Sequence, residues 1–192
     1  MKAIDALHAA KEAGLQVVMQ HCVTHQTAQS QALVDLCDYG KNHDFALDIL
    51  IARALGEWEG REDVLINEED ARALRDLHSR YPNAWRDTFP HYGVEKGCGT
   101  VDHTLHVTKY GDVLPCVYIQ VAIGNIFEKP LKEIIDCGFN IRHFREFNPV
   151  CLSGEDWNFI KKYMNKCHGK PIPAHYLEIF TDDEDFIDRT KK

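Results

Sequence analysis

The chain has 192 residues, of which 44% are hydrophobic and 27% are charged, and its formal net charge is −8. This length and composition predict a globular protein with one ordinary core, or a core with a small appendage. The acidic balance, with no cluster of lysine and arginine, argues against a nucleic-acid partner. No apolar run is long enough to span a membrane, and residues 1–14 contain no cleavable apolar segment, so a cytoplasmic protein with no membrane partner is expected.

The first part of the chain alternates helical and strand patterns. The predicted elements are a helix over 3–14, a strand over 15–23, a helix over 27–40, a strand over 45–55 and a helix over 67–81. Gly14 and Gly40 are expected to end the first two helices, and Asn67 to cap the third. The second strand is apolar enough for burial on both faces. Alternating helices and strands predict an α/β fold with a parallel sheet.

The pattern changes at about residue 85. The predicted elements are an antiparallel hairpin of 104–108 and 113–123, a helix over 130–138, a helix over 153–169 and a flexible tail over 181–192. Gly111 supplies the hairpin turn, and Pro115 places the start of the second strand at an edge or a bulge. Gly138 is expected past the end of its helix, and Ser153 is the expected cap of the next helix. The predicted domains are therefore residues 1–84 and 85–180, followed by the tail.

Seven cysteines with successive spacings of 15, 61, 18, 21, 14 and 16 residues give no compact disulfide pattern. In a reducing compartment they are core residues, metal ligands or nucleophiles. Cys22 lies in an apolar strand and Cys37 on the apolar face of a helix, so both are predicted to be core residues. Cys167 shares a helical face with Trp157, Ile160 and Met164, which also favours the core. The pattern assigns no place to Cys137.

Three other cysteines are candidate metal ligands. Gly97 and Gly99 free the backbone around Cys98 to turn its N–H groups toward a sulfur, which stabilises a thiolate ligand. The Gly111 turn allows Cys116 to approach Cys98. Cys151 lies in an irregular segment just before a helix and is able to swing toward a metal. Two cysteines 18 residues apart do not specify one metal.

The segment from Cys98 through twelve residues to Gly111, four more to Cys116 and then "GNIFEKPLKEI" resembles the SPASM or twitch extension of radical S-adenosylmethionine enzymes. In that family such a hairpin carries the first two ligands of an auxiliary iron–sulfur cluster. Upstream, "ARALGEWEGRED" is similar to the sixth strand and following loop of the family's partial (β/α) barrel, and "AIDALHAAKEAGLQVVMQHCVT" to the preceding helix and strand. "CLSGEDWNFIKKYM" is similar to the segment that closes many such extensions. The resemblance implies the C-terminal part of a partial barrel followed by a small α+β extension.

The chain departs from the family pattern in two places. It lacks the C-x3-C-x2-C loop that holds the cluster reducing S-adenosylmethionine, and it lacks the later C-x2-C-x5-C-x3-C run of a full SPASM domain. The resemblance therefore implies the C-terminal portion of a radical enzyme with at most one auxiliary [4Fe-4S] cluster. Its ligands are expected to include Cys98 and Cys116, with Cys151 and Cys167 as the remaining candidates. The chain alone is expected to be inactive in cleaving S-adenosylmethionine, and its substrate is a peptide or a small molecule.

In a complete enzyme the nucleoside would lie at the C-terminal ends of the barrel strands. By this analogy Thr24, Arg53, Leu55 and Gly56 are the residues expected near S-adenosylmethionine. Two predicted strands would leave an unpaired edge, so a companion chain supplying the rest of the barrel is a further expectation.

Two other classes of function remain open at this point. One is a structural zinc site, with Cys98 and Cys116 joined by two of Cys151, Cys167, His143 and His168 in a closed tetrahedral set. The other is a non-catalytic binding module left from a split gene, which the missing C-x3-C-x2-C loop favours.

Overall fold

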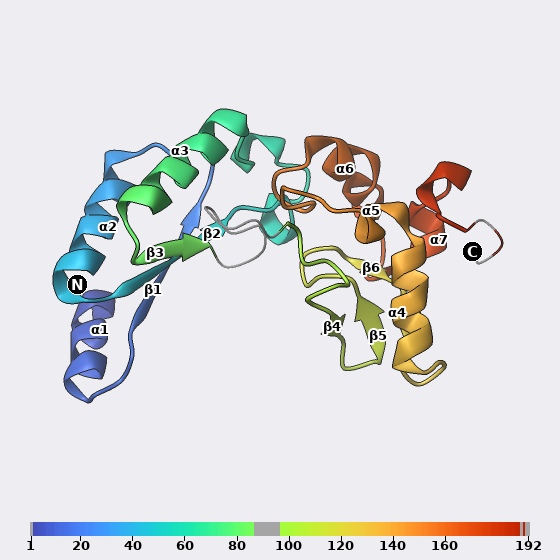
Figure 1. Cartoon of the computed structure of the whole chain (residues 1–192), viewed down its shortest axis with the longest axis horizontal. Helices are drawn as coiled ribbons and strands as arrows, with labels where there is room; N and C mark the ends of the chain where they lie inside the picture. Colours follow the sequence, from blue (N-terminus) through green and yellow to red (C-terminus); the bar gives the residue numbers. More distant parts are fainter. Residues whose placement is uncertain (1, 87–96, 189, 191–192) are drawn as a thin grey trace. The chain divides into compact units, whose positions relative to one another are not determined.

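The computed structural model of the chain describes residues 2–86, 97–188 and 190. The chain divides into two units: the first comprises Met1–Ala52 and Arg61–Glu95, and the second comprises Arg53–Gly60 and Lys96–Lys192 (Figure 1). The predicted domain boundary at residue 84 lies just before 87–96, which fall outside the described residues. Within the described ranges, every helix is too short or too polar to cross a bilayer.

The first unit is an open parallel sheet with helical connections. Its elements are α1 (Lys2–Glu12), β1 (Val18–Val23), α2 (Gln31–His43), β2 (Ala46–Ile51), η2 (Glu62–Val64), α3 (Glu68–Arg80) and β3 (Ala84–Arg86). The strand order is β1-β2-β3, and both pairings are parallel. The mixed α/β class predicted from the alternating pattern is confirmed. In the described part of the chain the sheet does not close into a barrel.

Burial in this sheet alternates along each strand. Met19 and Val23 of β1 and Leu47, Ile49 and Ile51 of β2 are buried on one face, and that face meets the helices, since Gly40 of α2 lies against Met19. The opposite face carries exposed Cys22. The predictions that Cys22 is a core residue and that the second strand is buried on both faces are therefore wrong. In the described part of the chain, residues of β1 and β2 alternate between a buried side that meets α2 and a more exposed side.

One helix end and one strand also differ from prediction. α2 continues through Gly40 to His43, and Asp44 ends it in the left-handed region with φ 53°. Gly40 serves close packing instead, because an added Cβ would lie 2.8 Å from Met19 Cε. The short strand β3 was not predicted, since three residues are too few for a periodic signal. Gly14, with φ 82°, follows α1 as expected, and Asn67 caps α3 in a capping box with Asp70.

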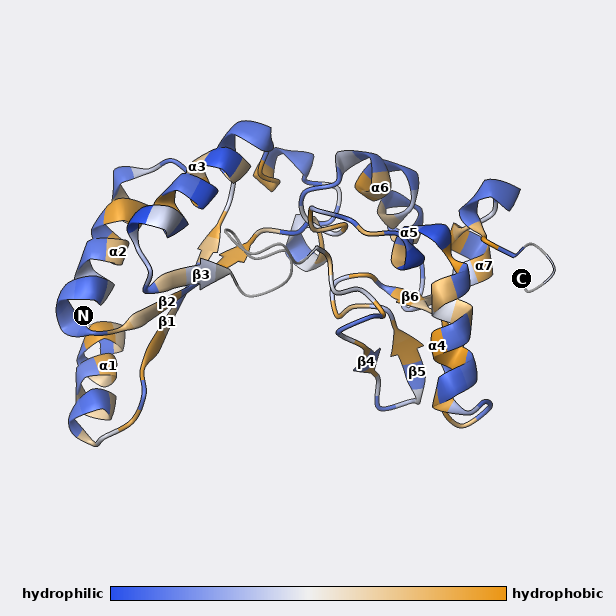
Figure 2. Cartoon of the chain, in the orientation of Figure 1, coloured by the Kyte–Doolittle hydropathy of each residue, from blue (hydrophilic) through white to orange (hydrophobic). Residues whose placement is uncertain are grey.

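The second unit is built from short pieces. Its elements are η1 (Gly56–Trp58), β4 (His106–Val107), β5 (Asp112–Leu114), β6 (Val121–Ala122), β7 (Gly124–Asn125), α4 (Leu131–Asn140), α5 (Arg142–Arg145), α6 (Trp157–Lys162), η3 (Met164–Cys167), β8 (Ala174–His175), α7 (Tyr176–Ile179) and η4 (Asp183–Asp185). Strands β4, β5 and β7 form one antiparallel sheet, and β6 pairs with β8 in parallel. Figure 2 shows β5 as a hydrophobic strand, and Val113 and Leu114 of this strand are buried.

The predicted hairpin is present, with Gly111 at its turn in a positive φ of 87°. Its second strand is much shorter than predicted, because the chain leaves β5 at Pro115 and turns over 116–119. Proline has no N–H to continue the ladder. Gly138 lies inside α4, packed against Ile123, and does not follow the helix.

The helix predicted over 153–169 is two pieces, α6 and η3. Its cap is Asp156, which accepts a hydrogen bond from the backbone N–H of Phe159, and not Ser153. Ile160, Met164 and Cys167 are buried as predicted. The predicted tail begins with a packed segment, in which Phe186 is 1% exposed and its backbone bridges Ile141. Residues 189 and 191–192 of that tail lie outside the described residues.

Candidate metal centre

Three thiols of the second unit converge on one site. Just before Cys98 the backbone passes close to the segment of Asn148, and the Cys98 N–H donates a hydrogen bond to the Asn148 carbonyl at 2.7 Å. Gly97 makes this close passage possible, because a Cβ there would lie 2.2 Å from the Asn148 oxygen. Cys116 lies in the turn that follows β5, and Cys151 in the turn before α6. The sequence predicted the approach of Cys98 and Cys116 from glycines and the hairpin, whereas Cys151 reaches them from 35 residues further along the chain.

The pKa values of Cys98 and Cys116 respond to the charge of Cys151, and that of Cys116 also responds to Cys98, which is consistent with three thiols in one region of the second unit. Burial and the nearby Cys151 raise the pKa of Cys98. Burial raises the pKa of Cys116 to about 11, and Cys151 and Cys98 add to that effect, while the Arg53 guanidinium opposes it. Like charges raise each other's pKa because ionising the second thiol places two negative charges side by side. These surroundings therefore favour the neutral thiol at Cys98 and Cys116, and a bound cation would compensate the charge of their thiolates.

Hydrogen-bond donors surround the three sulfurs. Backbone N–H groups of Leu152 and Thr100 stabilise the Cys98 thiolate, and the N–H of Tyr118 does the same for Cys116. The Thr100 hydroxyl lies 2.8 Å from the Cys98 sulfur. N–H···S contacts of this kind orient thiolate ligands and tune the metal that they bind.

Cys151 has its own polar neighbours. Its sulfur lies 3.4 Å from the Ser153 hydroxyl, and the Arg53 guanidinium donates to it at 3.8 Å. Each of the three cysteines thus contacts a group on the second residue after it, namely Thr100, Tyr118 or Ser153. A tight turn at each cysteine brings that residue back to the sulfur, and the local sequence therefore prepares each thiol as a ligand.

Cys167 does not share this environment. It is 8% exposed, and its thiol donates to the Gln120 carbonyl at 3.8 Å. Burial raises its pKa, and the charged groups that act on it are Lys170 and Glu59, with no contribution from another cysteine. Cys167 lines a small apolar pocket with Leu55 and Phe159. This agrees with the core position that its helical spacing predicts.

The histidines proposed for a zinc set have different surroundings. His143 Nε2 lies 2.9 Å from the Tyr163 hydroxyl, and burial lowers the pKa of this imidazole. The Tyr163 hydroxyl in turn donates to Asp185 at 2.5 Å. Among the residues that the structure describes, no three side chains of His, Cys, Asp or Glu are already arranged around a single metal ion.

The four residues predicted near S-adenosylmethionine lie in both units. Thr24 is in the turn after β1, where its N–H donates to the Thr27 hydroxyl at 2.9 Å. Leu55 and Gly56 begin η1, with Gly56 at φ 61°. Arg53 is 7% exposed and belongs to the three-thiol site, with its guanidinium 4.0 Å from the centre of the Tyr118 ring. Sequence reasoning missed this role because nothing local to Arg53 indicates which distant thiol it contacts.

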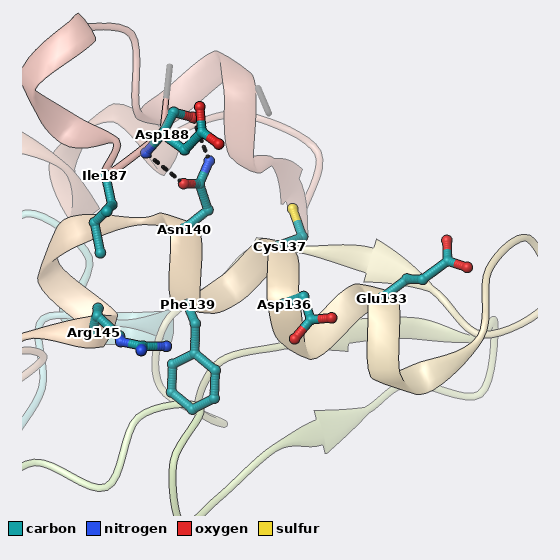
Figure 3. A pocket seen from close by; sticks show the side chains of 8 residues that line it. All are labelled: Glu133, Asp136, Cys137, Phe139, Asn140, Arg145, Ile187 and Asp188. Carbon is teal, nitrogen blue, oxygen red and sulfur yellow. Dashed lines mark hydrogen bonds between the residues drawn. The ribbon is translucent and has the colours of Figure 1, made fainter. Parts of the chain in front are cut away.

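A separate hollow of about 630 Å³ lies along α4 (Figure 3). Its lining residues are Glu133, Asp136, Cys137, Phe139, Asn140, Arg145, Ile187 and Asp188. The Asn140 amide donates to the Asp188 carbonyl and accepts its N–H, at 3.0 and 2.8 Å. Cys137, which the sequence left unassigned, interacts with the Tyr176 hydroxyl and raises the pKa of that phenol together with burial. Its neighbours are thus different from those of the three-thiol site.

Residues 98–168 match the family model of SPASM, an iron-sulfur cluster-binding domain. The match begins at Cys98 and includes Cys116, Cys151 and Cys167. It is consistent with a SPASM/twitch extension of a radical S-adenosylmethionine enzyme, and it confirms the resemblance predicted from the hairpin. No curated protein and no solved structure matches the chain.

The residues at the three-thiol site fit such a cluster. Cysteine thiolates are the usual ligands of iron–sulfur clusters, and hydrogen bonds to their sulfurs tune the bound iron. The SPASM segment supplies three neighbouring thiols, backbone donors to two of them and a buried cation beside the third. An iron–sulfur cofactor is therefore supported by the family match and by the chemistry of the donor set.

Proposed function

We propose that this chain is the iron–sulfur-binding C-terminal portion of a radical S-adenosylmethionine enzyme, with an auxiliary cluster on Cys98, Cys116 and Cys151. The observation that carries the proposal is the convergence of these three thiols within the SPASM segment. We further propose that the cluster is of the [4Fe-4S] type. When bound, it would supply a one-electron acceptor or a binding point for substrate.

The protein's own contribution is to hold and shield the ligands. The N–H groups of Leu152, Thr100 and Tyr118 stabilise the thiolates once their protons have left. Cys151 is buried and Cys98 and Cys116 are partly buried, and the close passage of Gly97 past Asn148 holds Cys98 in place. Three cysteines are fewer than the four that usually hold a [4Fe-4S] cluster. Cys167 is our candidate fourth ligand, and binding the cluster would require the end of η3 to move away from Gln120.

The parallel sheet of the first unit supports the wider enzymatic role that we propose. The order β1-β2-β3 with helical connections is compatible with the end of a partial (β/α) barrel. In a complete enzyme, Thr24, Leu55 and Gly56 would help to hold S-adenosylmethionine, which would supply radical chemistry toward a peptide or small molecule. We place the complete enzyme in the cytoplasm.

Anaerobic reconstitution with iron and sulfide tests the cluster. We expect a brown wild-type protein whose broad absorption is lost in Cys98→Ala, Cys116→Ala and Cys151→Ala. Cys22→Ala is the matched control, because Cys22 is exposed on the sheet of the first unit. Cys167→Ala tests whether Cys167 is the fourth ligand, because this substitution lowers the iron content only if Cys167 binds the cluster.

The same preparation distinguishes the two other candidate functions. A colourless protein that retains one zinc ion through the three cysteines would replace the iron–sulfur proposal with a structural zinc site. A protein that retains neither metal would indicate a non-catalytic module.

A further inference from the structure

Arg53 places a buried positive charge at the proposed cluster. Its side chain is 7% exposed, and one guanidinium nitrogen donates to the Cys151 sulfur at 3.8 Å. The guanidinium also stacks over Tyr118, 4.0 Å from the ring centre. These two contacts fix the cation between a residue of the Cys116 turn and the sulfur of Cys151.

The segment Arg53–Gly60 brings this cation into the second unit from far away in the sequence. A second contact holds the segment there, because Glu59 accepts the Gly169 N–H at 2.7 Å. An arginine is protonated at every accessible pH. Arg53 therefore brings a positive charge to the site.

Three thiolates that bind a cluster supply negative charge at this position, and adding an electron to the cluster makes it more negative still. Hydrogen bonds to the ligand sulfurs and nearby charges are among the main determinants of cluster potential. A fixed N–H···S donor with a positive charge stabilises the reduced form more than the oxidised form.

We propose that Arg53 is a positioning residue that raises the reduction potential of the auxiliary cluster through its contact with Cys151. This inference rests on the proposed function, since it requires a cluster on these cysteines. In the step concerned, one electron passes from an external reductant such as dithionite to the iron of the cluster. Arg53 keeps its proton, and no bond to it forms or breaks.

The test is a potentiometric titration of the anaerobically reconstituted protein, followed by electron paramagnetic resonance. We expect Arg53→Met to shift the one-electron equilibrium about tenfold toward the oxidised cluster, which is about 59 mV to lower potential. Arg53→Lys keeps the charge but not the planar fork, and it is expected to restore part of the shift. Arg61→Met is the matched control, because it removes the same charge from an exposed side chain paired with Asp63.

A second pair of variants tests the same contact if Arg53→Met fails to take up iron. Tyr118→Leu removes the ring that supports the guanidinium and is expected to lower the potential in the same direction. Tyr118→Phe keeps the ring and is expected to leave the potential within the spread of the wild-type measurements. Both variants keep the backbone N–H of residue 118 that donates to the Cys116 sulfur.

The outcomes separate the inference from the proposed function. A wild-type chain that takes up no cluster refutes the proposed function. If the reduction potential of the cluster is the same in Arg53→Met as in the wild type, the inference is refuted and the proposed function stands. If Arg53→Met takes up no iron, the same comparison is made with Tyr118→Leu.

Discussion

At the scale of single residues, the three-thiol site depends on one glycine. Gly97 lets the chain pass so near Asn148 that any side chain would collide with its carbonyl oxygen at 2.2 Å. The same passage sets the hydrogen bond from the Cys98 N–H to that oxygen. The Cys98 sulfur can therefore occupy its position only because residue 97 has no side chain.

We expect Gly97→Ala to displace Cys98 and to lower both stability and iron content. Overpacking of this kind typically costs about 1–3 kcal/mol. Gly14→Ala is the control, because Gly14 has a positive φ of 82° but no atom within 4 Å of its missing Cβ. Its backbone strain is expected to cost about 1–2 kcal/mol without changing iron content. Equal iron content in Gly97→Ala and wild type, measured after anaerobic reconstitution, would contradict the close-passage argument.

Cys37 gives a pH-dependent prediction. Burial, and then the charge of Asp38, raises the pKa of this thiol to about 11 from its usual 9.0. A thiol whose pKa is higher in the folded state than in the unfolded state contributes stability at pH values below the unfolded pKa. That contribution is lost as the pH rises from about 9 to about 11. Two pKa units correspond to about 3 kcal/mol at most.

Urea unfolding of the iron-free chain at pH 8 and pH 10.5 measures this loss. Cys37→Ala removes the titrating group, and it is expected to be less stable at pH 8 because it leaves a cavity at a buried position. Its further loss on going to pH 10.5 should be smaller than that of the wild type. The same loss in both proteins would show that the Cys37 thiol does not titrate in the folded chain as described.

At the scale of elements, helix α3 is joined to β1 through one buried carboxylate. Asp70 accepts hydrogen bonds from His25 at 2.7 Å and from Gln29 at 2.9 Å, and from the backbone N–H of Asn67 at 3.1 Å. Burial raises its pKa, but the hydrogen bonds from Gln29, His25 and Asn67 outweigh burial and hold the pKa below its usual value. The start of α3 is thereby tied to the turn that follows β1.

We expect Asp70→Asn to destabilise the first unit by about 1–3 kcal/mol at pH 7, because donors at a buried site lose their charged acceptor. A lowered carboxylate pKa gives stability that is present above the unfolded pKa and is lost as the pH falls through the folded pKa. The difference between the two proteins should therefore shrink between pH 7 and pH 3. Asp76→Asn, on an exposed position of the same helix, is the control; an equal effect of both substitutions in urea unfolding would refute the role of Asp70.

Local sequence rules predicted the parts of the fold that depend on neighbours in the chain. The Asn67 cap, the turn at Gly111 and the buried face of Ile160, Met164 and Cys167 were predicted from spacing alone. Glycine was misleading at Gly40 and Gly138, because both glycines allow close packing inside a helix instead of ending it. Sequence does not distinguish these two uses of glycine without the partner against which it packs.

The candidate site shows the same division. The approach of Cys98 and Cys116 follows from a hairpin and was predicted, whereas the contact between Arg53 and Cys151 joins residues 98 positions apart. Contacts of that range depend on how the whole unit packs. Cys22 was misassigned for a related reason, since the strand pattern does not reveal which side of β1 is exposed.

At the scale of the whole molecule, β1 is paired on one side only, with β2, in the described part of the chain. Its exposed residues include Val18, at 46%. An unpaired parallel edge favours association. We expect the isolated protein to elute above its monomer mass in size-exclusion chromatography unless a companion chain covers β1. A single monomeric species at high concentration would contradict this prediction.

The isolated chain is also expected to release no 5′-deoxyadenosine from S-adenosylmethionine with a strong reductant, because it has no C-x3-C-x2-C loop. The measurement is a chromatographic assay of the reconstituted protein, with a complete radical S-adenosylmethionine enzyme as positive control. Catalytic turnover by this chain would contradict the proposal that it lacks the part of the enzyme that cleaves S-adenosylmethionine.

The central claim is that Cys98, Cys116 and Cys151 together hold one iron–sulfur cluster. Native mass spectrometry of the anaerobically reconstituted chain tests it most directly, because the added mass identifies the bound species. We expect one [4Fe-4S] cluster on the wild type and on Cys22→Ala, and the mass of the bare polypeptide for the variant in which all three cysteines are alanine. A cluster of the same mass on that triple variant, or a wild type that carries only zinc, would contradict it.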